Sequence, residues 1–185
     1  FVNEDETVSE ETYHYGEEID IPADPTKAAD VEYIYDFKAW SPDISKVCHD
    51  DATYEATYRR TNQYYTVTWF NDNKVVHSES NYKYNAKIQQ AVINEPDGYR
   101  DPAVGKEWAF KEWIQCNASG QPINAEGIVV AEVNAARFVR GQKMGSEHLY
   151  FYPVFEEVAK TVTVKFYKED GTTWIGDAKV PYGEN

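Results

Sequence analysis

The chain has 185 residues, enough for one ordinary domain or for two to three small modules. Its 32 Asp and Glu against 18 Lys and Arg give a formal charge of -14, which has the wrong sign for binding nucleic acid and disfavours an anionic membrane surface. The longest apolar run, at 128–131, is far shorter than the roughly 20 residues of a spanning helix, so we expect no nucleic-acid partner and no membrane insertion.

Aromatic and β-branched residues dominate the composition and the predicted elements. Aromatic residues make up 15% of the chain, with 15 Tyr against a single Met, which is typical of β-structure rather than of a helical bundle. β-Branched and aromatic residues alternate with period two over 65–70 and 161–166, and turn-forming residues follow at 72–73 and 169–171. Each segment therefore predicts the first strand of a β-hairpin.

Three sequence elements recur in the same order along the chain. The first element pairs a leading Phe with a later Tyr, at spacings of 14, 14 and 16 residues: Phe1 and Tyr15, Phe70 and Tyr84, Phe166 and Tyr182. The second element recurs at 35–40 and 108–113, and the third at 54–58 and 151–155. This order predicts a first module at 1–61 with a truncated first strand, a second at 62–158, and the opening hairpin of a third at 159–185.

The Tyr-Thr-Val-Thr-Trp strand at 65–69, the Tyr-Gly-Glu at 15–17, and above all the run from Asp24 through Trp40 to Tyr58 carry a family resemblance. Together they resemble the Listeria–Bacteroides repeat, the family of the internalin B-repeat found in tandem on bacterial surface and secreted proteins. The likeness covers nearly all of the first module and is weaker over the second, where Tyr84-Asn85 replaces Tyr-Gly. The resemblance implies a curled sheet over a short helix or crossover and no enzymatic residues. We therefore predict a mainly β to α+β chain of tandem small β-grasp-like modules.

The second module contains an insertion at about 114–148. Trp40 and Tyr58 are 18 positions apart, whereas Trp113 and Phe155 are 42 apart, so about 24 residues are added at a single point. Asn124 is a candidate N-cap for a helix through Val129, Val133 and Ala136 that ends at Gly141. A helix with such a Val-rich face would pad the sheet.

The same insertion carries the one basic cluster of this acidic chain, namely Arg137, Arg140 and Lys143. Inserted segments between strands project from the surface, where binding residues concentrate. These three residues are the predicted partner-binding site, with a purely structural helix as the alternative.

Two further groups suggest chemistry but have simpler structural explanations. Trp40 and Trp113, beside the alternating Tyr33, Tyr35 and Phe37, could form a platform for sugar rings, although their recurrence at one repeat position favours core packing. The run at 48–51, Cys-His-Asp-Asp, lacks the further ligands that a zinc site needs. We therefore predict no metal site and no cofactor.

The two cysteines are too few for a disulfide scaffold. Cys48 and Cys116 follow their tryptophans at unequal distances and lie in different predicted modules, so we expect two free thiols.

Phosphate-binding loops and catalytic signatures are absent from the sequence, so we do not expect an enzyme. The prediction is a non-catalytic extracellular segment, secreted or cell-wall attached, that acts in adhesion to a protein or glycan ligand and as a spacer. The alternative is a carbohydrate-binding accessory segment of a secreted glycan-processing enzyme. Because the first strand and the last module look incomplete, we also expect exposed strand edges that self-associate.

Overall fold

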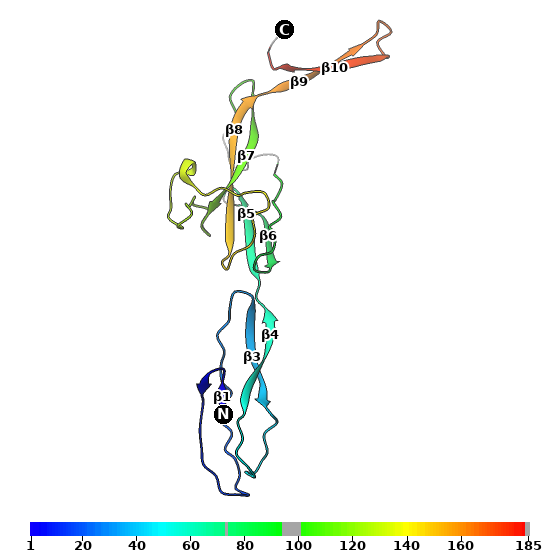
Figure 1. The fold of residues 1–185 in the computed structure, drawn as a ribbon. Coiled ribbons are helices and arrows are strands. Elements are labelled where there is room, and N and C mark those ends of the chain that lie inside the picture. Colours follow the sequence, from blue (N-terminus) through cyan, green and yellow to red (C-terminus); the bar gives the residue numbers. More distant parts are fainter. Residues whose placement is uncertain (73, 94–100, 184–185) are drawn as a thin grey trace. The chain divides into compact units, whose positions relative to one another are not determined.

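The computed structural model describes residues 1–72, 74–93 and 101–183, and the chain divides into two compact units, Phe1–Tyr64 (unit 1) and Tyr65–Asn185 (unit 2). The described residues form strands and a single short 3-10 helix, so the prediction of a mainly β chain is confirmed (Figure 1). The β-grasp form of each module stays a prediction. Among the described residues, no helix is long and apolar enough to span a bilayer.

Unit 1 is built on a mixed four-stranded sheet of order β2-β1-β4-β3. β3 pairs antiparallel with β4, and β1 lies parallel to β4 with Val2 opposite Glu55. A register shift leaves Lys38 as a bulge, so Phe37 and Trp40 share one face of the sheet, with 5.5 Å between ring centroids. The strands are β1 (Val2–Asn3), β2 (Glu6–Thr7), β3 (Tyr33–Ser41) and β4 (Glu55–Asn62).

Unit 2 contains a sheet with the equivalent order, β6-β5-β8-β7, in which β5 lies parallel to β8 and the other neighbours are antiparallel. A bulge recurs at Lys111 and again places two aromatic residues, Phe110 and Trp113, close together, at 5.4 Å. A separate two-stranded sheet pairs β9 with β10. The strands are β5 (Tyr65–Asn71), β6 (Lys74–Tyr82), β7 (Lys106–Cys116), β8 (Leu149–Ala159), β9 (Thr161–Tyr167) and β10 (Trp174–Pro181).

The strand pairing corrects the predicted alignment of the leading aromatic residue. Sequence spacing equates Phe1 with Phe70, but the parallel pairing of Trp69 with Phe151, compared with that of Val2 with Glu55, makes Trp69 the equivalent of Phe1. β6 carries an additional residue at each of two register shifts, opposite 65–67 and opposite 69–70, so spacing along the sequence does not follow the register of this hairpin. A slip of one residue matters because it moves every side chain to the opposite face of the sheet.

The Tyr-Gly pair after each hairpin has a conformational reason. Gly16, Asn85 and Gly183 all adopt positive φ, at 83°, 64° and 85°. Asn is among the few other residues that enter this left-handed region readily, so Tyr84-Asn85 preserves the backbone of the Tyr-Gly positions.

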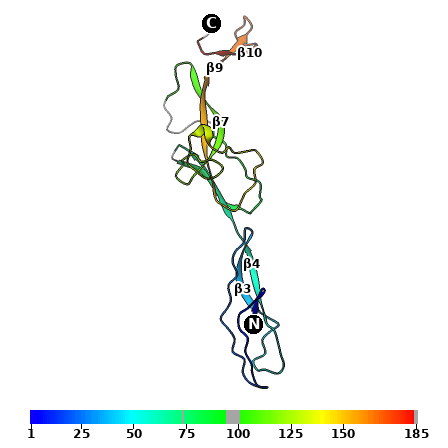
Figure 2. The same ribbon diagram turned by 60° about the vertical axis from the view of Figure 1, so that its left-hand side comes forward.

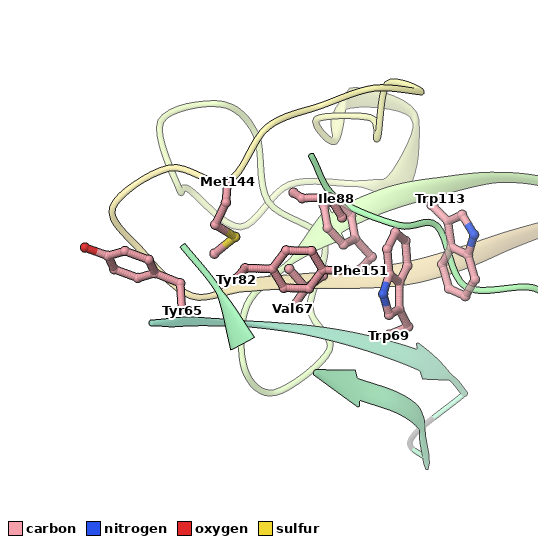
Figure 3. Close-up of a cluster of buried hydrophobic side chains, with 8 residues drawn as sticks. All are labelled: Tyr65, Val67, Trp69, Tyr82, Ile88, Trp113, Met144 and Phe151. Carbon is pink, nitrogen blue, oxygen red and sulfur yellow. The ribbon is translucent and has the colours of Figure 1, made fainter. Parts of the chain in front are cut away.

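Both units have aromatic cores, and that of unit 2 is larger. Trp40, Tyr54 and Ala56 form the buried cluster of unit 1. In unit 2, Trp69 packs with 4.8 Å between its ring centroid and that of Trp113, and with 4.6 Å to Phe151 (Figure 3). The full buried cluster of unit 2 comprises Tyr65, Val67, Trp69, Tyr82, Ile88, Trp113, Met144 and Phe151.

The predicted helix in the insertion is wrong. The only helical turn there is a 3-10 segment at Glu132–Asn134, and Val133 is 73% exposed. Asn124 does not cap a helix, because its Oδ1 accepts hydrogen bonds from the backbone N–H groups of Glu126 and Ile128 and reverses the chain. In both views the insertion, coloured green-yellow to yellow, follows an irregular path beside the strands of unit 2 (Figures 1 and 2).

Candidate functional site

The predicted basic site is only partly available for a ligand. Arg137 donates from Nε to Glu112 Oε2 at 2.9 Å and from Nη1 to the carbonyl of Ala135 at 2.9 Å. Its guanidinium therefore ties the insertion to β7. Arg140 and Lys143 are exposed. The predicted site thus contains one anchoring arginine and two cations that face solvent.

The second half of the insertion belongs to the core of unit 2. Phe138 lies 5.3 Å from both Trp69 and Phe151 between ring centroids, and Met144 is buried. Backbone bonds hold this stretch in place, from Phe138 N to the carbonyl of Trp113 at 3.0 Å and from Met144 N to that of Ala86 at 2.8 Å. Figure 3 shows Met144 reaching from the insertion toward Tyr82 and Val67. This half therefore acts as a cover over the aromatic face of the sheet.

The tryptophans considered as a sugar platform are not accessible. Trp40 and Trp113 are both buried, and Trp113 Nε1 donates to the carbonyl of Ala91 at 3.3 Å. Their position agrees with core packing rather than with a binding platform.

The tyrosines beside Trp40 are covered by cations from unit 1 itself. Lys27 Nζ lies 4.7 Å from the ring centroid of Tyr35, and the Arg60 guanidinium lies 4.8 Å from that of Tyr33. Lys27 is fixed by an ion pair with Glu4, and the hydrogen bond to that carboxylate raises the pKa of the lysine. These two rings are therefore already in contact with cations of the same unit.

The cysteines lie in different units and are both free. Burial raises the pKa of Cys116 to about 12, so its thiol stays protonated at neutral pH. Cys48 is only partly buried. Among the described residues, no group of three or more His, Cys, Asp or Glu side chains is placed to hold a metal ion.

One face of the β9–β10 hairpin carries exposed apolar side chains. Val162 pairs with Val180 and Val164 with Ala178, and Phe166 lies on the same face. We name this surface the hairpin patch; it consists of Val162, Val164, Phe166, Ala178 and Val180.

Strand pairing equates the hairpin patch with the buried face of β5. Val164 corresponds to Val67 and Phe166 to Trp69, but the exposed fractions are 39% and 50% for the two hairpin residues and 0% for both residues of β5. Several neighbouring apolar residues exposed on one face of a strand pair mark an interaction surface more reliably than single exposed residues do. The alternation over 161–166 was the sequence signal for this surface.

A rigid turn supports the hairpin patch. Asp170 accepts hydrogen bonds at Oδ1 from the backbone N–H groups of Thr172 and Thr173, at 2.8 and 2.7 Å. Hydrogen bonds from Thr173 lower the pKa of this carboxyl to about 2, so the turn keeps its charge-assisted bonds at ordinary pH.

Charge distinguishes the hairpin from unit 1. Unit 1 has 16 Asp and Glu against five Lys and Arg, and so carries -11 of the total charge of -14. The stretch 159–183 has four Lys and three Asp or Glu. An apolar patch on a nearly neutral segment can approach other proteins without the repulsion that unit 1 would impose.

Comparisons with known proteins gave no match, whether with protein-family models, with curated proteins or with solved structures.

Proposed function

We propose that this chain is a non-catalytic repeat segment of a bacterial cell-surface protein, located outside the cell, where it holds and presents a binding surface. The observation that carries the proposal is the recurrence of one strand order, β2-β1-β4-β3 and β6-β5-β8-β7, in consecutive units, followed by a third hairpin. Each unit has a core of its own, so added units extend the chain without enlarging a common core. The resemblance to the Listeria–Bacteroides repeat supports the same location.

The hairpin patch is the surface we propose for partner binding, with Arg140 and Lys143 of the insertion as a second contact region. A protein ligand fits these features better than a glycan, because the tryptophans on which the glycan alternative depends are buried. β-Strand edges beside an apolar face also bind extended polypeptide by adding a strand.

Surface labelling tests the proposed location. Antibodies raised against the purified chain should stain intact cells of the source organism, and mild protease treatment of those cells should remove the staining. A cytosolic protein stained in parallel controls for cell integrity. Staining that appears only after permeabilisation would contradict the proposal.

Self-association tests the hairpin patch. At high protein concentration we expect a reversible dimer, because two exposed apolar hairpin faces or edges can pair. The variant V164K should remain monomeric in sedimentation equilibrium, whereas V133S, a change of a more exposed valine in the insertion, should dimerise as the wild type does. Equal dimerisation of both variants would place the contact elsewhere.

A further inference from the structure

A cavity of about 540 Å³ lies in unit 1 at the start of β1. One wall is formed by Thr7 and residues 9–13, and another by residues 50–54. Phe1 and Ile19 contribute apolar surface, and Tyr54 lies 5.1 Å from the ring of Phe1. The cavity is therefore bordered by two stretches of polypeptide and lined in part by apolar groups.

Unit 2 shows what occupies the corresponding place there. The parallel pairing equates Ala52–Tyr54 of the cavity wall with Leu149–Phe151 of β8. The opposite walls also correspond, because Tyr13 Oη accepts from Asp20 N at 3.0 Å as Tyr82 Oη accepts from Gln89 N at 3.2 Å. Between these walls in unit 2 lies the first half of β5, residues 65–68.

The side-chain pattern of the first half of β5 indicates which segment would fit the cavity of unit 1. Val67 pairs with Leu149 on one side and with Glu79 on the other. Its side chain is fully buried, and that of Tyr65 is almost fully buried. Thr66 and Thr68 alternate with them and bond to Ser80 and Ser78 on β6. An occupant of the same kind has apolar side chains at every second position and small hydroxyl side chains between them.

Two features of unit 1 point to the same occupant. Val2 N donates to the carbonyl of Tyr54 at 2.8 Å, so the cavity lies where this parallel ladder would continue. The cavity lining also includes Glu10, Glu11, Asp50 and Asp51, which disfavour an acidic segment. The ladder supplies backbone recognition, and the carboxylates select against negative charge.

We propose that this cavity is an acceptor slot for an extended, neutral or basic polypeptide segment with the alternating pattern of Tyr-Thr-Val-Thr, running parallel to Ala52–Tyr54. Bound there, the segment would add strand pairing on both sides and place its apolar side chains against Phe1, Ile19 and Tyr54. The inference does not depend on the proposed cell-surface location, because it concerns only how unit 1 binds a strand.

A tethered ligand tests the slot at high effective concentration. Tyr-Thr-Val-Thr is fused directly before Phe1 of the full chain, which places its Tyr and Val at the positions that correspond to Tyr65 and Val67. The matched control fuses Thr-Tyr-Thr-Val, which has the same composition but points the apolar side chains to the opposite face. Cys48 lines the cavity and serves as the reporter, since the deeply buried Cys116 is silent toward a maleimide in the folded protein.

The Tyr-Thr-Val-Thr variant should react at Cys48 about tenfold more slowly than the unmodified chain, because the reagent needs an open slot. Its unit 1 melting transition should rise by roughly 5 °C or more, while the Thr-Tyr-Thr-Val control matches the unmodified chain in both measurements. Equal labelling rates and melting temperatures for the two fusions would overturn the proposal. A dimer of the unmodified chain that disappears in both fusions would also overturn it, because the occupant would then be a second copy.

Discussion

Replacing Trp69 with alanine is expected to unfold unit 2 while leaving unit 1 folded. Trp69 is fully buried, and its ring contacts Trp113, Phe138 and Phe151 at centroid distances of 4.8, 5.3 and 4.6 Å. Truncation of a buried Trp costs about 3–5 kcal/mol through lost burial and an unfilled cavity. That loss is comparable with the total stability of a small domain. Urea denaturation monitored by circular dichroism should show an early transition for unit 2.

Two control variants separate packing from other effects of the tryptophan. W174A removes a mainly exposed indole from the hairpin and should shift the unit 2 transition by less than about 0.5 kcal/mol. W69F should cost much less than W69A, because Trp69 Nε1 is buried with no hydrogen-bond partner, so phenylalanine sacrifices no bond. If W69A and W174A shift the transition equally, the aromatic cluster does not hold unit 2 together.

Replacing residues 117–145 with a short Gly-Ser linker is expected to destabilise unit 2 by more than about 4 kcal/mol. The replacement removes Met144 and Phe138 from the aromatic face and exposes Trp69 and Phe151 beneath them. It also removes the backbone bonds between Met144 and the 85–86 stretch. Thermal unfolding followed by near-ultraviolet circular dichroism measures the loss directly.

Exposed residues of the insertion supply the control for the linker variant. A double substitution, I128S with V133S, changes exposed side chains in the same segment and should leave the melting temperature within about 2 °C of the wild type. The variant R140S with K143S should be equally stable, and a loss of partner binding in it would assign these cations to recognition. Unchanged melting of the linker variant would show that the insertion does not contribute to the core.

Local sequence patterns were sufficient to predict several of the strands. Period-two patterns at 65–70 and 161–166 mark β5 and β9, and the recurrence of 35–40 at 108–113 marks two edge strands with the same bulge, at Lys38 and Lys111. These features are local, since they follow from which residues suit a pleated strand and from where one face must be buried. The aromatic residues predicted to pack, Trp40 and Trp113, are buried for the same reason.

Tertiary structure decided what depends on partners distant in sequence. Sequence spacing equated Phe70 with Phe1, but the pairing of Trp69 with Phe151, 82 residues away, makes Trp69 the equivalent residue. The helix expected after Asn124 did not form, because local turn bonds and the packing of Phe138 and Met144 outweigh a weak helical pattern. Val67 and Val164 have similar sequence surroundings, yet only Val67 is buried, because β8 and the insertion cover β5 while one face of β9 remains open. Alternation thus determined which residues could face a core, and long-range packing decided which of them did.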